Sequence, residues 1–153
     1  MDQIATRPFR NDDYNACLSI FDGNVPKFFS PDERVEFAQF LDSIGSSTNL
    51  YLVLTLSDCI VACGGLSIGP DPRTASLCWG MVDPVWHRQG LGTRLTIERL
   101  KLARSSAEVA EVVLATSQHT SPFYERHGFR VVNITPNGFT AGLDRYDMML
   151  RLV

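Results

Sequence analysis

Apolar and polar residues are spaced along the chain in a way that predicts strands and helices in a mixed order. Residues 4–8 are interpreted as a short strand, and apolar residues then recur at helical spacing in segments 14–21 and 31–44. Three runs rich in leucine, valine and isoleucine follow, with the short turns of an antiparallel meander, at 50–56, 59–68 and 74–82. The first half therefore predicts one strand, two helices and three paired strands.

The second half of the chain predicts helices between strands. Apolar residues spaced by three and four indicate a mostly buried helix from 91 to about 104, whose polar stripe is Arg94, Glu98 and Lys101. The elements expected after it are a buried strand at 111–117, a short helix that Ser121-Pro122 starts and that runs through 123–127, and strands at 129–134 and 146–152 joined by a turn at 136–138.

Local signals predict where several elements begin and end. Ser30, Pro31 and Glu33 have the pattern of an N-cap, a first-turn proline and a capping box, so the second helix is expected to begin there. Gly45 is expected to end it. The Gly64–Gly65 pair inside a strand predicts a bulge, or a place where a ligand or another backbone comes close.

Residues 84–93, Pro-Val-Trp-His-Arg-Gln-Gly-Leu-Gly-Thr, join a strand to the long helix through a glycine turn. The first amides of a helix have no partners within it, and the helix dipole places partial positive charge at that end. Gly90 and Gly92 lack a Cβ, so a phosphate can approach the backbone, and His87 and Arg88 can add charge. The pattern fits an anion site, and it also fits a tight turn before a core helix.

Two phosphate-binding motifs are excluded for this turn. A Walker loop needs a Gly-Lys-Ser/Thr sequence, which does not follow here. A Rossmann fingerprint needs a third glycine three positions after Gly92, where Leu95 stands.

The composition is that of an ordinary globular protein. With 153 residues, 44% of them hydrophobic and 20% charged, residues 1–153 are expected to form a single domain. The net charge of −3 gives no reason to expect nucleic acid or an anionic membrane as a partner, and it would not repel an amine. No apolar run approaches the ~18 residues of a membrane span, and no signal-peptide pattern is present, so a cytoplasmic location is expected.

The four cysteines lie in apolar stretches and form no C-x-x-C pair: Cys17, Cys59, Cys63 and Cys78. No histidine cluster completes a zinc-binding set with them, and no metal site is expected. Buried, reduced thiols are the simpler interpretation, and a structural disulfide is the alternative.

Two motifs and the order of elements carry a resemblance to a known family. A strand ending in Val82-Asp-Pro84 precedes His87-Arg-Gln-Gly-Leu-Gly92, and Phe123-Tyr-Glu-Arg-His-Gly-Phe129 follows later. Together they resemble the GNAT (Gcn5-related N-acetyltransferase) superfamily over essentially the whole chain. The resemblance implies an α+β, three-layer fold: a mixed, mostly antiparallel sheet of about seven strands flanked by about four helices, with strands four and five parallel and splayed.

The resemblance also implies acetyl-CoA as the acyl donor, and it implies the residues that hold it. The pantetheine arm would bond to the backbone near Met81 and Val82, between the splayed strands. His87 stands where the family usually has Arg or Gln, and Ser117 where relatives often carry an Asn that contacts the cofactor. The pyrophosphate would rest on amides at the start of the helix, from Arg88 through Gln89, Gly90, Leu91 and Gly92 to Thr93.

The implied reaction is direct transfer of an acetyl group to a primary amine. An amine with a pKa of ~10.4 must lose a proton before it attacks, and the departing thiolate benefits from a proton donor. Tyr124 has the position of that acid in the family pattern, and a core tyrosine is the alternative. No carboxylate stands at 76–79, where many relatives carry a glutamate base, so proton removal is left to ordered water with a backbone carbonyl, His119, Glu36 or Asp32.

The sequence does not identify the acceptor beyond a small-molecule or peptide amine. Neither nucleic acid nor a membrane is expected as a partner, and a homodimer is left open. Phe28 and Phe29 lie between the first two predicted helices, where they either line a substrate entrance or anchor the loop through core contacts. The alternative function is a catalytically weak acyl-CoA-binding sensor or interaction module on the same fold, because the family's carboxylate is missing.

Overall fold

The described part of the chain, residues 3–46 and 49–152, has the predicted order of strands and helices. In these residues the computed structural model has seven strands: β1 (Ile4–Pro8), β2 (Asn49–Leu56), β3 (Cys59–Ile68), β4 (Thr74–Val82), β5 (Glu111–Thr116), β6 (Arg130–Thr140) and β7 (Leu143–Arg151). The helices of the same residues are α1 (Tyr14–Gly23), α2 (Glu33–Ser43), α3 (Leu91–Arg104) and α4 (Ser121–Glu125), with short 3₁₀ turns η1 (Asn11–Asp13) and η2 (Pro84–Trp86).

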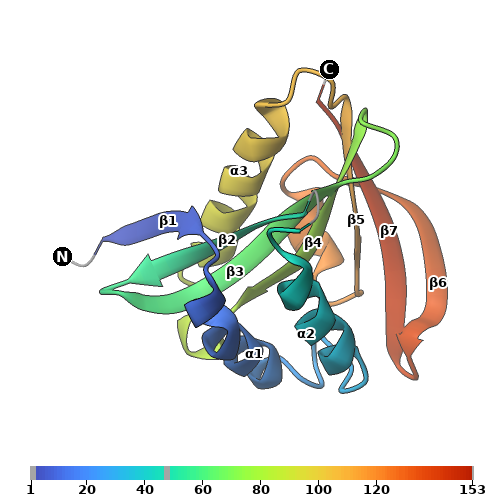
Figure 1. The fold of residues 1–153 in the computed structure, drawn as a ribbon. Helices are drawn as coiled ribbons and strands as arrows, with labels where there is room; N and C mark the ends of the chain where they lie inside the picture. Colours follow the sequence, from blue (N-terminus) through green and yellow to red (C-terminus); the bar gives the residue numbers. More distant parts are fainter. Residues whose placement is uncertain (1–2, 47–48, 153) are drawn as a thin grey trace.

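The strands form one open sheet in the order β1-β2-β3-β4-β5-β7-β6. Every neighbouring pair is antiparallel except β4 and β5, which are parallel. Figure 1 shows α1 and α2 on one face of the sheet and α3 on the other. The predicted mixed sheet with parallel fourth and fifth strands is therefore confirmed.

An ion pair ties β1 to the start of α1. Arg7 donates two hydrogen bonds to the Asp13 carboxylate, at 2.7 and 2.9 Å, and the Arg10 backbone N–H donates a third at 2.8 Å. The hydrogen bonds from Arg7 hold the pKa of Asp13 below its ordinary value, and burial of the carboxylate acts in the opposite direction.

The start of α2 lies two residues later than predicted. The Glu33 carboxylate accepts a hydrogen bond from the Ser30 backbone N–H at 2.9 Å, which is half of the predicted capping box. The Ser30 hydroxyl instead accepts from the Asp32 N–H at 3.2 Å, so Ser30–Asp32 form a turn and the helix begins at Glu33. Gly45 follows the helix in a left-handed conformation, with φ +96°, as expected for a residue that ends it.

The predicted turn at 136–138 is wrong. β6 continues through these residues to Thr140, and the chain reverses at 141–142 instead. The Asn137 N–H donates to Asp144 at 2.8 Å, and the Asn137 side-chain oxygen accepts from the Gly142 N–H at 2.7 Å. Asn137, with φ +55°, thus forms an irregularity within a longer hairpin, where the pairing register shifts between Thr135 and Thr140.

Apolar side chains fill the space on both faces of the sheet. Under α1 and α2, the fully buried rings of Phe21 and Phe37 lie against Tyr51 and Trp79. On the opposite face, buried residues of α3 pack on β3, β4 and β5. Full burial of one such side chain stabilises the fold by about 1.5–3 kcal/mol.

The sheet opens where β4 and β5 separate. The two strands pair only near their N-terminal ends, at Thr74–Glu111, Ala75–Val112 and Ser76–Val113. Beyond these pairs β4 continues along β3 while β5 continues along β7. The predicted splay is therefore present, and it leaves a gap between the C-terminal halves of the two strands.

A bulge shapes β4 at this gap. Gly65 pairs with Cys78 and Cys63 with Met81, so Trp79 and Gly80 together stand opposite Gly64. Trp79 has φ +49°, a strained conformation for a bulky residue. The Tyr51 hydroxyl donates a hydrogen bond to the Trp79 carbonyl at 2.7 Å, which holds the bulge in place. The prediction of a bulge around Gly64–Gly65 is confirmed, although the extra residue belongs to β4.

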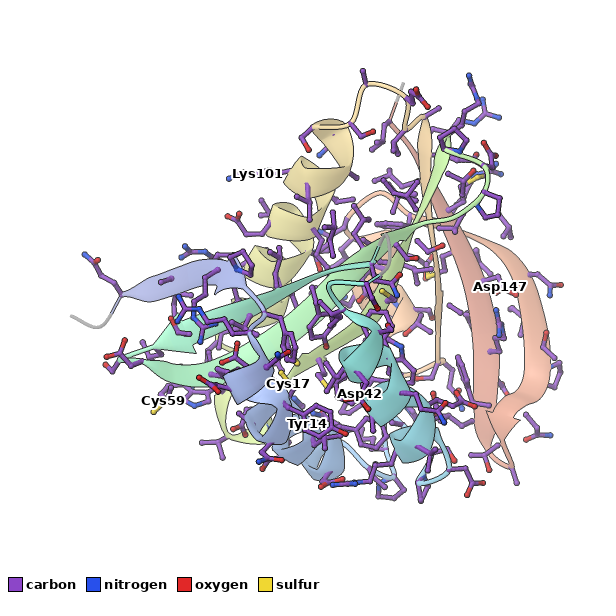
Figure 2. All side chains as sticks on the ribbon, viewed as in Figure 1. Tyr14, Cys17, Asp42, Cys59, Lys101 and Asp147 are labelled. Carbon is purple, nitrogen blue, oxygen red and sulfur yellow. The ribbon has the colours of Figure 1, made fainter. Side chains whose placement is uncertain are left out.

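The cysteines are all free thiols, and they differ in exposure. Cys17 of α1 and Cys63 of β3 are buried beside one another between the helix and the sheet, whereas Cys59 is exposed at the turn between β2 and β3. Figure 2 shows Cys59 at the outer end of these strands and Cys17 on α1, next to the sheet. The expectation of buried thiols is thus wrong for Cys59, because the first residue of β3 lies beyond the edge of the core.

No helix in the described residues is long and apolar enough to cross a lipid bilayer.

Candidate active site

A cleft of about 1030 Å³ lies along the gap between β4 and β5. It extends from the connection between α1 and α2 to the first turns of α3 and α4. Most predicted site residues line it: Phe28, Phe29, Met81, Val82, His87, Arg88, Gly90, Gly92, Thr93, Ser117 and Tyr124. Gln89 and Leu91 are not among its described lining residues, since Gln89 points to solvent and the Leu91 side chain packs in the core.

The start of α3 presents unpaired amides beside the cleft. Gly90 precedes the helix with φ +82°, and its carbonyl accepts the first helical hydrogen bond, from the Arg94 N–H, at 3.0 Å. Within residues 3–46 and 49–152, no acceptor engages the backbone N–H groups of residues 88–93. Together with the positive end of the helix dipole, these amides can bind an anion such as a phosphate.

Gly92 keeps a passage open between α3 and α4. A Cβ added to it would lie 3.4 Å from the Phe123 ring and 3.9 Å from the Val82 side chain. These are ordinary van der Waals contacts, so the site has room for a methyl group but for little more. Gly92, Phe123 and Val82 all line the cleft, so a side chain at position 92 would narrow it between the start of α3 and the end of β4.

The backbone of Val82 faces away from β3, towards the open side of β4. The next residue, Asp83, donates its N–H to the Val61 carbonyl of β3 at 2.9 Å, and successive residues of a strand face opposite sides. The Val82 carbonyl accepts hydrogen bonds from the Asn24 side chain at 3.0 Å and from the His87 ring at 2.8 Å. His87 therefore donates its Nε2–H to this carbonyl, which joins the end of β4 to the turn before α3.

Tyr124 belongs to both the core and the cleft. The residue is 9% exposed, and its ring makes edge-on contacts with Phe123 and Phe129, at centroid distances of 5.1 and 5.8 Å. Its hydroxyl oxygen accepts a hydrogen bond from Arg99 Nη2 at 3.3 Å, and the residue lines the cleft. The two interpretations of this tyrosine are thus compatible, because the ring packs in the core where the cleft reaches it.

Arg99 is a site residue that sequence reasoning did not single out. It lies on the apolar face of α3, one turn after Leu95 and one turn before Ala103, and only 2% of its surface is exposed. It lines the cleft beside Tyr124. A charged residue on the buried face of an amphipathic helix is the sequence signal that would have identified it.

Ser117 organises the turn between β5 and α4. Its hydroxyl accepts a hydrogen bond from the His119 N–H at 3.3 Å and lies 3.5 Å from the Thr120 hydroxyl. Its carbonyl accepts from the N–H groups of Thr120 and Ser121, at 3.1 and 3.0 Å. The side chain is therefore occupied with the local turn, and it lies where the cleft meets α4.

Aromatic residues form the opposite end of the cleft. Phe28 makes edge-on contacts with His87 and His119, at centroid distances of 5.7 and 6.4 Å. Phe29 stacks on Trp79, at 6.0 Å with 25° between the rings. Both phenylalanines line the cleft, and Phe29 also packs against the core under α1 and α2.

Charged residues of both signs line the cleft. Glu33 and Glu36 line it from α2, with Lys27 on the connection just before that helix, while the arginines Arg88, Arg99 and Arg126 line it near α3 and α4. Burial raises the pKa of Glu33 above its ordinary value, and the hydrogen bond from Ser30 acts in the opposite direction. Of the side chains considered as proton acceptors, His119 and Glu36 line the cleft, and Asp32 is not among its described lining residues.

The bulged part of β4 offers a thiol to the cleft, and this thiol is a poor base. Cys78 lines the cleft, and burial raises its pKa to about 11. The side chain is therefore a neutral thiol near neutral pH.

Comparison with solved structures shows the same fold in several acetyltransferases. A putative GNAT acetyltransferase from Desulfovibrio desulfuricans is 22% identical, with a TM-score of 0.85 over 99% of this chain and 100% of the other. The ribosomal-protein-S18-alanine N-acetyltransferase from Escherichia coli is 24% identical, with a TM-score of 0.78 over 98% and 94% of the two chains. An aminoglycoside 6'-N-acetyltransferase complexed with coenzyme A is 14% identical, with a TM-score of 0.78 over 97% of each chain.

A family model extends this likeness from fold to family. No curated protein gives a significant match to the chain. The model described as "Acetyltransferase (GNAT) domain", however, matches residues 26–152, which include the whole cleft apart from its edge at residues 23–25. The chain therefore belongs to the GNAT family of acetyltransferases and is an acyltransferase.

Proposed function

We propose that this protein is an acetyl-CoA-dependent N-acetyltransferase that moves an acetyl group to a primary amine by direct attack. The observation that carries the proposal is a single cleft that joins the unpaired amides before α3, the gap between β4 and β5, and Tyr124. Acetyl-CoA, as the acyl donor, is a substrate that must reach all three places at once. The proposed location is cytoplasmic.

The cleft fits the parts of a CoA molecule. The amides of residues 88–93, with the Arg88 side chain nearby, suit the pyrophosphate. Gly92 leaves room for the narrow pantetheine arm. Next to Met81, the Val82 N–H faces the open side of β4 and can donate to an amide carbonyl of the arm, whereas the Val82 carbonyl is already occupied by Asn24 and His87. Under this proposal the thioester lies at the bulge of β4, beside Tyr124.

The acceptor amine would approach from the side of α1 and α2. The carboxylates of Glu33 and Glu36 attract an ammonium group, and Phe28 and Phe29 can pack against its apolar part. Such an amine must lose a proton before it attacks, because its pKa is near ~10.4. Glu33, Glu36 and His119 line the cleft and are the side chains positioned to accept it, directly or through water.

Tyr124 would complete the reaction as the general acid. When the amine attacks the carbonyl carbon and the carbon–sulfur bond breaks, the electron pair passes to sulfur, and the phenol gives its proton to that thiolate. A backbone N–H at the bulge of β4 would stabilise the oxyanion. Because the hydroxyl is the only group removed, Tyr124→Phe should lower kcat by ~10²-fold or more while KM for acetyl-CoA changes little.

The test is turnover of acetyl-CoA with a panel of amines, followed by release of free thiol. The panel should contain a polyamine, an aminoglycoside, an amino acid amide and peptides with free N-termini, with Tyr124→Phe measured alongside. Acetyl-CoA at a hundredfold excess over Kd should also stabilise the fold by ~2.7 kcal/mol, which NADH and ATP should not do. Acetyl-CoA binding without turnover of any amine would instead favour an acyl-CoA sensor, the function to which the missing carboxylate at 76–79 points.

A further inference from the structure

Arg99 carries a buried positive charge that no carboxylate in the described part of the chain neutralises. Within residues 3–46 and 49–152, no carboxylate oxygen lies within 4.0 Å of its guanidinium group. The buried Nε has no hydrogen-bond partner there, and Nη2 makes its hydrogen bond to an uncharged hydroxyl, that of Tyr124. Buried charges are normally paired, because an isolated one is costly to remove from water. This cation is therefore expected to have a function when the cleft is occupied.

The backbone of β3 and β4 is shaped around the Arg99 side chain. A Cβ on Gly80 would lie 2.8 Å from both Nη1 and Nη2, and a Cβ on Gly64 would lie 3.2 Å from Nε. The guanidinium thus occupies the space that two absent side chains leave at the bulge. It is held at the gap between β4 and β5, where the cleft passes.

The hydrogen bond between Arg99 and Tyr124 can form in only one direction. A guanidinium has donors and no acceptor, so the Tyr124 oxygen must accept, at 3.3 Å. The hydrogen of the Tyr124 hydroxyl consequently points away from Arg99 and is free to be donated to another group. The cation also stabilises negative charge on that oxygen.

We propose that Arg99 is a positioning residue for acyl transfer, which orients the Tyr124 hydroxyl and stabilises the phenolate that proton donation leaves behind. The inference rests on the proposed function. As the carbon–sulfur bond breaks, the electron pair passes to sulfur, the Tyr124 proton passes to the thiolate, and the free thiol of CoA leaves. The phenolate stays paired with the Arg99 cation until it regains a proton from solvent. The proton lost by the amine passes to solvent, so the protons balance over the full cycle.

The first test is the effect of Arg99→Met and Arg99→Lys on steady-state kinetics, with Arg104→Met as the control. Arg104 is exposed in the last turn of the same helix, so its substitution should leave kcat unchanged. Arg99→Met should lower kcat about 10–100-fold with less than a threefold change in KM for acetyl-CoA, and Arg99→Lys should retain more of the activity. Circular dichroism and the melting temperature identify any variant that fails to fold.

A double-mutant cycle asks whether Arg99 acts through Tyr124. In the Tyr124→Phe background, Arg99→Met should cost less than threefold in kcat, because the group that it orients has already been removed. Guanidinium ion at millimolar concentration should partly restore kcat of Arg99→Ala, since the vacated space beside Gly64 and Gly80 fits it. The ion should not restore the Arg99→Ala/Tyr124→Phe variant. A purely structural role predicts neither the rescue nor its dependence on Tyr124.

The outcomes separate the two proposals. Arg99 has no role through Tyr124 if the wild type transfers acetyl groups while folded Arg99→Met keeps its kcat. The same conclusion follows if the effects of Arg99→Met and Tyr124→Phe on kcat multiply in the double variant. Malonyl- and succinyl-CoA form another arm: if the wild type prefers them at least tenfold over acetyl-CoA and Arg99→Met loses that preference through KM, Arg99 binds an acyl carboxylate and the inference is wrong. If no amine supports turnover by the wild type, the proposed function fails and the inference fails with it.

Discussion

Replacing Gly92 by alanine should raise the stability of the protein and weaken its binding of CoA. Gly92 is the second residue of α3, has no positive φ, and would place its Cβ 3.4 Å from Phe123 without a clash. Alanine is favoured over glycine in a helix by about 0.5–1 kcal/mol. For a protein of this size, 1 kcal/mol corresponds to about 2–4 °C, so the melting temperature should rise by roughly 1–4 °C.

The same methyl group narrows the passage between α3 and α4 that the pantetheine arm must cross. A tenfold loss of affinity, about 1.4 kcal/mol, is expected when calorimetry measures CoA binding to Gly92→Ala and to the wild type. Gly142→Ala is the matched control: Gly142 has φ +81° in the β6–β7 turn with open space around it. That control should lose about 1 kcal/mol of stability and keep its CoA affinity. Unchanged CoA affinity in stable Gly92→Ala would refute the proposed route of the ligand.

Two further predictions concern titration and reactivity. The hydrogen bonds from Arg7 hold the pKa of Asp13 below its ordinary value, so the stability from this pair is complete above about pH 5 and is lost as pH falls through the folded pKa. The free energy of unfolding measured with urea should therefore fall more between pH 5 and 2 in the wild type than in Asp13→Asn. Exposed Cys59 should react first with a thiol reagent, whereas Cys78, with a pKa raised to about 11, is only ~0.1% thiolate at pH 8 and should react slowly and be protected by CoA. The assignment of the slow phase of thiol modification to Cys78 would be contradicted if Cys78→Ser kept that phase at the wild-type rate. The role of Asp13 would be contradicted if the stability of Asp13→Asn fell with pH as much as that of the wild type.

The sheet could be predicted from the sequence because its signals are local and agree with one another. The bounds of β3 and β4 match the predicted ranges 59–68 and 74–82, since runs of apolar residues end there at unmistakable turns. The glycine turn before α3 was likewise predictable, because Gly90 has the positive φ that favours glycine at this position. In each case the residue type alone restricts the conformation.

The β6–β7 hairpin could not be predicted in the same way. Pro136-Asn-Gly138 is a strong local turn signal, and the turn nevertheless forms at 141–142. The contacts that decide this are not local: Gln118, from the loop after β5, accepts from the Asp144 N–H and donates to the Gly142 carbonyl, both at 2.9 Å. A sequence read segment by segment does not contain this information.

The candidate site shows the same division between local and distant causes. Tyr124 and the amides before α3 were identified from short motifs, and the structure brings them to one cleft. Arg99 was missed because the sequence analysis placed the charged residues of α3 on one solvent-exposed stripe, and Arg99 lies outside that stripe. The reason for a buried arginine lies in Gly64 and Gly80, on two strands that the helix crosses. Recognising it requires the packing of the helix on the sheet.

The separation of β4 and β5 gives this protein two strand edges that face each other inside one molecule. Unpaired edges normally invite pairing with strands of other chains, which leads to aggregation. Here the N-terminal pairs from Thr74 to Ser76 close one end of the gap, and α3 and α4 carry residues that line it, so a foreign strand has little access while a thin, extended molecule with amides along its length can enter. The fold thus leaves part of its own sheet unfinished, and an extended ligand can complete it.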